Sequence, residues 1–281
     1  MQNVTVTQPR RPFTPSRRRD RLATARAAVI AAAAVTAVAM ALAAPAGGSV
    51  RLFADDFGGR DRLLTNEFAY WNPHDPLAIR STRWEMDSGS LFVRNGAAWT
   101  GRPDDVAPNA RSTTGTDSAI FRLRTRRHDF VDVAVTFNLR NLGFTRTEKT
   151  PRDDWDGVHI WLRYQTEQGP LYYASINRRD RKAVIKKKCP GGSENGGKYV
   201  ELSPEVPHGF PLRHWQHVRA TISTLPTGAV AITLFAEGRI VAAATDAGSG
   251  GCAPIRRGGA VGLRGDNDEF ETDDFVVDSL R

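Results

Sequence analysis

The stretch GVHIWLRYQ, residues 157–165, carries residue types that could do chemistry at alternating positions. Successive side chains of an extended strand point to opposite faces of the sheet. His159, Trp161 and Arg163 are therefore predicted to share one face, with an apolar face behind them. A titratable ring, an aromatic plate and a cation together are unusual for a merely solvated surface, so this face is a candidate binding surface.

The two segments that follow continue the pattern. Tyr173, Ser175, Asn177 and Arg179 alternate in LYYASINRRD, and AVIKKK adds Lys186. If the three strands are neighbours with their polar faces together, they form a cationic, aromatic-bearing groove that suits an anionic polysaccharide. The predicted substrate-binding residues are Trp161, Arg163, Asn177, Arg179 and Lys186.

The same groove would also allow an elimination reaction. A polysaccharide lyase must neutralise a uronate carboxylate and remove the neighbouring proton with a base. The candidate bases are His159 and Tyr173, and the candidate neutralising groups are Arg163 and Asn177. A plain alternative stays open, because sheets commonly have one polar side that meets solvent or a loop.

Residues 1–46 are predicted to be a signal peptide. A basic stretch, RRPFTPSRRRDR, precedes an Ala-rich segment without charge from Ala27 to Ala46, and Ala-Pro-Ala stands just before Gly47. An uncleaved anchor is the alternative, because about 20 apolar residues can span a bilayer. The first interpretation predicts secretion of residues 47–281 as one domain, and the second predicts a non-catalytic envelope or adhesion module.

Removing the leader changes the charge argument. The chain has 39 Lys+Arg and 31 Asp+Glu, a net charge of +8. Residues 1–46 hold seven of the basic residues and one of the acidic ones, which leaves 32 against 30, a net charge near +2, for residues 47–281. The high pI is mainly a property of the leader, so nucleic acid is not expected as a partner.

The two cysteines, Cys189 and Cys252, lie in segments that contain Gly or Pro. In an exported protein two cysteines most simply form one disulfide. Two free thiols are the alternative. The chain has no CxxC pair and no Cys/His cluster with the spacing of a zinc site.

About a dozen short alternating or β-branched runs follow the leader, separated by Gly, Pro, Asn and Asp. This pattern predicts an all-β fold, a two-sheet antiparallel jelly-roll sandwich. The segment LFAEGRIVAA predicts a hairpin with Glu237 and Gly238 at its turn.

A series of C-terminal motifs resembles the concanavalin A-like lectin/glucanase superfamily, in particular the laminin-G-like and family-16-glucanase-like jelly rolls of secreted bacterial proteins. The motifs are HWQHVRATI, GAVAITLFAEGRIV, AATD, GGAVGLRG and DDFVV, and LFADDF with WEMDSGSLFV fits the first strands. The resemblance covers residues 51–281. It implies the fold but not an activity, because the superfamily contains lectins, carbohydrate-binding modules, hydrolases and lyases.

The resemblance also bears on catalysis and on metal binding. Family-16 hydrolases carry Glu-x-Asp-x-(x)-Glu on one strand, whereas residues 85–90 read EMDSGS without a second Glu, so a retaining glucanase is not expected. In such sandwiches the first and last strands lie side by side, and many hold a structural calcium on their convex side, built from backbone oxygens and an Asp of the final strand. The resemblance therefore implies a Ca²⁺ site at Asp56 and Asp274, with Asp55 and Asp273 as alternates.

The sequence thus favours a secreted, monomeric carbohydrate-binding jelly roll. The decisive spatial question is whether the predicted residues of the three central strands line one open groove.

Overall fold

The structure is a computed structural model that describes residues 49–280, apart from 105–115, 149, 166–168 and 195–196. The predicted signal peptide, residues 1–46, lies outside the described residues. In the described part of the chain, no helix is both long and apolar enough to cross a membrane.

Within the described ranges, the strands form two large antiparallel sheets and one small parallel pair. The nine-stranded sheet has the order β17-β16-β15-β9-β19-β5-β4-β2, and β1 pairs with β19. Its strands are β1 (Arg51–Asp55), β2 (Arg62–Asn66), β4 (Ser90–Arg94), β5 (Ala97–Trp99), β9 (Val133–Phe144), β15 (Gln216–Thr224), β16 (Val230–Ala236), β17 (Arg239–Asp246) and β19 (Asp268–Ser279).

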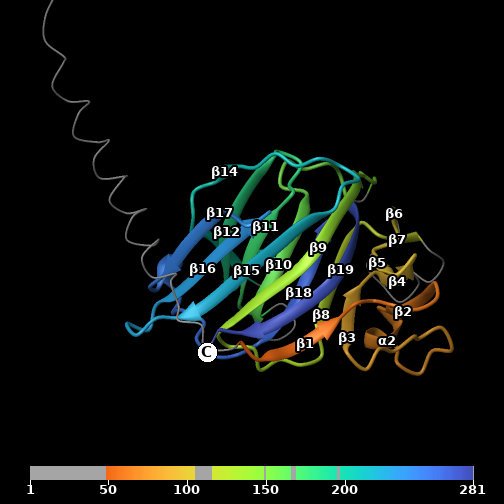
Figure 1. Cartoon of the computed structure of the whole chain (residues 1–281), viewed down its shortest axis with the longest axis horizontal. Coiled ribbons are helices and arrows are strands. Elements are labelled where there is room, and N and C mark those ends of the chain that lie inside the picture. Colours follow the sequence, from red (N-terminus) through yellow and green to blue (C-terminus); the bar gives the residue numbers. More distant parts are fainter. Residues whose placement is uncertain (1–48, 105–115, 149, 166–168, 195–196, 281) are drawn as a thin grey trace, which may run out of the picture. The chain divides into compact units, whose positions relative to one another are not determined.

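The eight-stranded sheet has the order β13-β12-β11-β10-β18-β8-β3, and β14 pairs with β12. In Figure 1 its central strands lie behind β9, β15 and β19 of the nine-stranded sheet. Its strands are β3 (Trp84–Ser88), β8 (Ile120–Thr125), β10 (Gly157–Tyr164), β11 (Leu171–Ile176), β12 (Lys182–Glu194), β13 (Gly197–Glu201), β14 (Val206–Pro207) and β18 (Ala260–Asp266).

Four short elements of the described chain lie outside these sheets. Strands β6 (Arg102–Asp104) and β7 (Thr116–Ser118) pair in parallel with each other. The helix α2 (Phe68–Trp71) follows β2, and the 3₁₀ turn η2 (Ser249–Gly251) follows β17. The prediction of a two-sheet antiparallel sandwich is confirmed, and the parallel β6–β7 pair is an addition that the sequence did not indicate.

One apolar core lies between the two sheets. In β9, Val135, Phe137 and Leu139 are fully buried while the residues between them are partly exposed, as expected for a strand with one face on a core. They belong to the same apolar cluster as Ile160 and Leu162 of β10. The core thus joins the two sheets, and it fixes which face of β10 points outward.

Two local predictions are confirmed. Glu237 and Gly238 join β16 to β17, and both have positive φ angles of 50° and 72°, as in a type I′ turn. The first strand β1 lies beside the last strand β19 in antiparallel register.

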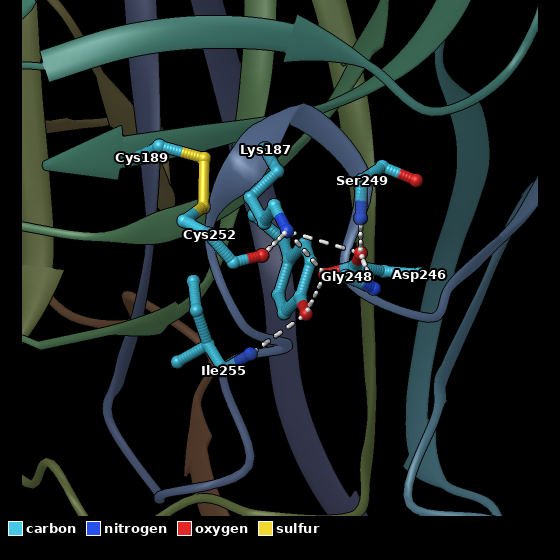
Figure 2. The surroundings of a disulfide bond; sticks show 8 residues. Lys187, Cys189, Asp246, Gly248, Ser249, Cys252 and Ile255 are labelled. Atoms are coloured by element: carbon cyan, nitrogen blue, oxygen red, sulfur yellow. Dashed lines mark hydrogen bonds and ion pairs between the residues drawn. A yellow bond between two sulfur atoms is a disulfide. The ribbon is translucent and has the colours of Figure 1, made fainter.

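A disulfide joins Cys189 of β12 to Cys252, which follows η2, as the sequence predicted (Figure 2). Beside it, the fully buried Lys187 Nζ lies 2.8 Å from Asp246 Oδ2 and donates to the carbonyl oxygen of Cys252 at 2.9 Å. Tyr172 donates to the same Asp246 oxygen at 2.7 Å. Burial by itself would raise the pKa of Asp246, but the hydrogen bonds that it accepts from Lys187 and its other donors lower it. Hydrogen bonds from neighbouring groups therefore offset the cost of burying this ion pair.

Candidate functional site

A cavity of about 310 Å³ lies on the outer face of the eight-stranded sheet. His159 follows Val158 and precedes Ile160, both in the core between the sheets, so strand alternation turns its ring outward toward this cavity. The cavity is lined by Trp155, His159, Tyr173, Ser175, Arg178, Lys186, Glu194, Tyr199, Arg264 and Asp266.

Strand register brings the lining residues together. His159 of β10 is paired with Ser175 of β11 on one side and with Arg264 of β18 on the other. Tyr173 of β11 is paired with Lys186 of β12. Directly paired residues of an antiparallel sheet present their side chains on the same face, so the polar groups converge over β10.

A continuous polar network runs across the floor of the cavity. Ser175 Oγ lies 2.8 Å from His159 Nδ1, and Nε2 of the same ring lies 3.0 Å from Asp266 Oδ2. Arg264 donates from Nε and Nη2 to the other carboxylate oxygen, Oδ1, at 2.9 and 2.8 Å. Arg264 Nη1 also donates to the Tyr173 hydroxyl at 2.9 Å. The two oxygens of Asp266 thus face two different partners, and Oδ2 meets the imidazole at ion-pair distance rather than in an aligned hydrogen bond.

The surroundings set the charges of this network. Burial lowers the pKa of His159 and outweighs the opposing effect of Asp266, so the imidazole is neutral near pH 7. Burial alone would raise the pKa of Asp266, but Arg264 and His159 together hold it well below its usual range. Burial raises the pKa of the Tyr173 phenol. The site therefore holds a neutral histidine, an ionised aspartate and a protonated tyrosine.

Arg163 does not belong to this surface, and the prediction that it shares the face of His159 and Trp161 is wrong. The register between β10 and β18 shifts between Trp161 and Tyr164, and Arg163 has a positive φ of 50°. Such a bulge places two residues opposite one and breaks the strict alternation. The Arg163 side chain is fully buried and donates to Val131 O, Ile255 O, Asp132 Oδ1 and Thr224 Oγ1.

The same bulge turns Tyr164 to the face predicted for Arg163. The Tyr164 ring stacks on Trp161 with centroids 4.9 Å apart, and both residues are buried. Trp161 borders a neighbouring cavity of about 20 Å³. The indole is therefore packed into the sheet surface and does not line the larger cavity.

Asn177 and Arg179 also lie away from the cavity, contrary to the predicted shared groove. The Asn177 amide donates to Asn141 at 2.6 Å and to Gln216 at 2.7 Å, and both acceptors belong to the nine-stranded sheet. Arg179 pairs with Asp156 at 3.1 Å and lies over the Phe144 ring at 4.7 Å. Both residues follow the end of β11, where the strand alternation no longer applies.

Three of the seven predicted site residues do line the cavity: His159, Tyr173 and Lys186. Lys186 Nζ also lies 3.0 Å from Glu201 Oε1. The rings of His159 and Tyr173 meet edge to face with centroids 5.5 Å apart. The two candidate bases are therefore neighbours.

Sequence reasoning missed several lining residues. Trp155 precedes β10 and is 45% exposed, and Arg178 follows β11 and is almost fully buried. Arg264 and Asp266 alternate in the motif GLRGD of β18. A charged pair at alternate positions of a buried strand was a usable signal, but only the pairing of β18 with β10 shows its relation to His159.

The predicted calcium residues already bond to the protein. Asp56 Oδ1 accepts from Gly58 N at 3.1 Å, and Asp274 Oδ2 accepts from Asn138 at 3.0 Å. Burial and the charges of Asp274 and Asp56 raise the pKa of Asp273. The described residues include no cluster of three or more His, Cys, Asp or Glu that could hold a metal ion. Calcium binding at Asp56 and Asp274 stays a prediction.

Comparison with known proteins gave matches among solved structures. No family model matches the chain, and no curated protein matches it. LamAcat from Zobellia galactanivorans superposes with a TM-score of 0.50 and 12% identity, covering 81% of this chain and 97% of that one.

Two further structures superpose similarly. SCLam, a non-specific endo-β-1,3(4)-glucanase of family GH16, has a TM-score of 0.51 and 10% identity, with 85% and 94% of the two chains covered. A chain from work on endo-acting O-glycanases of the human gut microbiota has a TM-score of 0.52 and 10% identity, with 83% and 100% covered. The shared architecture confirms the fold that the sequence motifs implied. The chain shares the two-sheet jelly-roll fold of these solved structures.

Proposed function

We propose that the protein binds a glycan in the cavity on the outer face of its eight-stranded sheet. The observation that carries the proposal is a half-exposed indole, Trp155, in the lining of a cavity whose floor is a charged hydrogen-bond network. Sites for small polar ligands combine such aromatic surface with a few fixed polar groups. The solved structures of the same fold include SCLam, an endo-β-1,3(4)-glucanase, which supports this class of ligand.

The lining offers two kinds of contact. Trp155 supplies an apolar plate for the C–H face of a sugar ring, and Tyr199, partly buried, adds a second ring with a hydroxyl. Three lining side chains are cationic, Arg178, Lys186 and Arg264, against the acidic Glu194 and Asp266. The surplus of positive charge favours an anionic sugar over a basic one.

A pair of tryptophan variants tests the location of the site. Trp155→Ala is the test, and Trp215→Ala is the matched control, because Trp215 is 41% exposed but lines a separate cavity on the nine-stranded sheet. Arg140 already covers the Trp215 ring at 4.4 Å. Calorimetric titration with a panel of acidic and neutral oligosaccharides should show binding by the native protein and by the control. We expect Trp155→Ala to raise Kd by roughly 10- to 30-fold, the effect of losing an aromatic anchor.

Two results of that experiment contradict the proposal. One is the absence of binding to every glycan of the panel by the folded native protein. The other is loss of binding in Trp215→Ala with unchanged binding in Trp155→Ala, which would move the site to the opposite sheet.

The elimination alternative finds less support in the geometry. Both ring nitrogens of His159 face protein partners, Ser175 and Asp266, so neither is free to take a proton from a sugar directly. The raised pKa of Tyr173 disfavours its phenolate. New ultraviolet absorbance from unsaturated uronates, in digests that Tyr173→Phe abolishes, would establish the lyase instead.

Secretion remains part of the proposal and rests on the composition of residues 1–46 alone. Recovery of the protein in the culture medium without its leader is the expected result. Retention of the full-length chain in the detergent phase of a partition experiment would establish the anchored alternative.

A further inference from the structure

We propose that Ser175, His159 and Asp266 form an acyl-transfer centre that hydrolyses an acyl ester carried by the bound glycan. The proposal rests on the proposed function for the nature of the alcohol part of the ester. The ester cleavage itself is argued from the three side chains. They come from three neighbouring strands, β11, β10 and β18, and all three line the cavity.

The network fixes the position of the proton on His159. The ionised Asp266 can only accept, so the Nε2 that faces it carries the hydrogen. The neutral ring then presents the lone pair of Nδ1 to Ser175, whose hydroxyl at 2.8 Å must donate to it. A serine that donates to a histidine, with the histidine oriented by a carboxylate, is the arrangement of an activated nucleophile.

The order of the two nitrogens differs from the common serine-hydrolase template, in which the serine faces Nε2 and the aspartate faces Nδ1. Either nitrogen of a neutral imidazole can accept a proton when the other carries the hydrogen. The exchange follows from the sheet, because Ser175 and Asp266 approach His159 from strands on its two sides. The chemical roles are unchanged.

Arg264 acts as a positioning residue. Two of its hydrogen bonds go to Asp266 Oδ1 and leave Oδ2 facing the imidazole. The guanidinium also keeps Asp266 ionised, since it lowers the pKa of that carboxyl. The carboxylate can therefore stabilise the imidazolium that forms when His159 takes a proton.

Arg178 supplies donors for the charge that develops on the ester oxygen. Its side chain is 4% exposed and lines the same cavity. One nitrogen, Nη2, pairs with Asp180 and Glu205, whereas Nε and Nη1 have no hydrogen-bond partner among the described residues. Buried donors without partners are rare in folded proteins. A cation with such donors in the cavity that Ser175 also lines suits an oxygen that becomes negative in the transition state.

The reaction balances with water as the only co-substrate. Ser175 Oγ forms a bond to the carbonyl carbon while its proton passes to His159 Nδ1, giving a tetrahedral oxyanion. Collapse breaks the bond to the sugar oxygen, which leaves with the proton from His159. Water then attacks the acyl-serine in the same way and releases a carboxylic acid and free Ser175. No oxidant, reductant or metal is needed.

The experiment uses the purified protein and two readouts. A fluorophosphonate probe, which phosphonylates activated serines, is followed by peptide mass spectrometry. Hydrolysis is measured on 4-nitrophenyl acetate and on acetylated xylan oligosaccharides. Ser175→Ala and His159→Gln are the test variants, and Ser223→Ala, on β15 of the other sheet, is the matched control. Circular dichroism and Tm establish that each variant is folded.

We expect the adduct on Ser175 in the native protein and in the control. Ser175→Ala should lose the adduct, and both test variants should hydrolyse esters at least about 10³-fold more slowly. Ser175→Cys, which keeps a nucleophile at the same place, should retain reactivity, now with thiol reagents that leave the native protein unmodified. Folded native protein without an adduct on Ser175, or a Ser175→Ala variant that hydrolyses at the native rate, would overturn the proposal.

The experiments distinguish a failure of the glycan-binding proposal from a failure of the acyl-transfer proposal. Oligosaccharide binding by the native protein without labelling or hydrolysis would overturn the acyl-transfer centre and leave the glycan site standing. Labelling and hydrolysis of 4-nitrophenyl acetate without binding of any glycan would support the centre and overturn the proposed function.

Discussion

Ser175 and His159 are directly paired across β11 and β10, and their side chains lie 2.8 Å apart from Oγ to Nδ1. This contact uses the one ring nitrogen that Asp266 leaves available. A buried histidine with a polar partner close to each ring nitrogen is held neutral and fixed in orientation. The position of His159 in the sheet is therefore expected to affect both the stability of the protein at acid pH and the chemistry in the cavity.

The buried His159 makes the fold sensitive to acid. The pKa of His159 is lowered in the folded protein, whereas the pKa of a histidine in the unfolded chain is about 6.5. As the pH falls through about 6.5 toward the lowered pKa, the unfolded chain binds a proton that the folded protein does not, so the free energy of unfolding decreases. His159→Gln should weaken this pH dependence. Urea unfolding at a series of pH values measures it.

Two other histidines define the control for that measurement. His208 also has a pKa lowered by burial, so the dependence should become smaller in His159→Gln without vanishing. His217→Gln changes an exposed ring and should reproduce the native dependence. An unchanged dependence in His159→Gln would contradict the assignment of the effect to this ring.

Arg163 is predicted to stabilise the fold without taking part in binding. Its guanidinium is fully buried and bonded to Asp132 at 2.9 Å. Arg163→Met leaves that carboxylate buried without its cation, a loss of about 3–5 kcal/mol in the free energy of unfolding. Chemical denaturation measures the loss, and titration of the folded fraction should give the native Kd. If Arg163→Met folds with native stability but binds glycan more weakly, Arg163 lies on the binding surface, as strand alternation predicted.

His159 and Arg163 show which part of the site strand alternation predicts and where that prediction ends. Alternation placed His159, Tyr173 and Lys186 on the outer face correctly, because β10, β11 and β12 are regular at those positions. It failed after Trp161, where the bulge against β18 reverses the faces. The extra residue lies in β10 itself, but nothing in GVHIWLRYQ marks it, since the register shift is defined against Ala260 and Gly262 of β18, far along the chain.

The fold itself was predictable for a different reason. Strand existence and the hairpin at Glu237 and Gly238 depend on local pattern and turn chemistry. The pairing of β10 with β18 joins segments far apart in the chain, and a single sequence carries no local signal for it. The partners of His159 on β18 therefore became visible only in the structure.

The disulfide is predicted to contribute strongly to stability. Cys189 and Cys252 are 63 positions apart, and closing a loop of that length reduces the entropy of the unfolded chain by an amount worth about 4 kcal/mol. The double variant Cys189→Ala/Cys252→Ala should show this loss in denaturant unfolding. Reduced native protein should show a similar loss, which controls for the substitutions. Equal unfolding midpoints of oxidised and reduced protein would contradict the prediction.

Lys188 should give the opposite pH dependence at alkaline pH. It is almost fully buried beside the small cavity that Trp161 borders, and burial, with the positive charges of Arg122 and Arg264, lowers its pKa to about 8. An unfolded lysine titrates near about 10.4. At a pH below both values, Lys188 is charged in the folded protein, and its burial lowers the free energy of unfolding by the full cost of that charge. As the pH rises above about 8, the folded protein releases this proton before the unfolded chain does. The free energy of unfolding therefore increases.

Lys188→Met removes the charge and keeps much of the side-chain volume. The variant should have a higher Tm than the native protein at pH values below about 8, and the difference should shrink as the pH approaches the unfolded value. Lys198→Met, at an exposed position of β13, is the matched control and should leave Tm unchanged at every pH. The Tm difference between Lys188→Met and the native protein depends on pH only if the pKa of Lys188 changes on folding. A difference that is the same at every pH would therefore contradict the lowered pKa of Lys188.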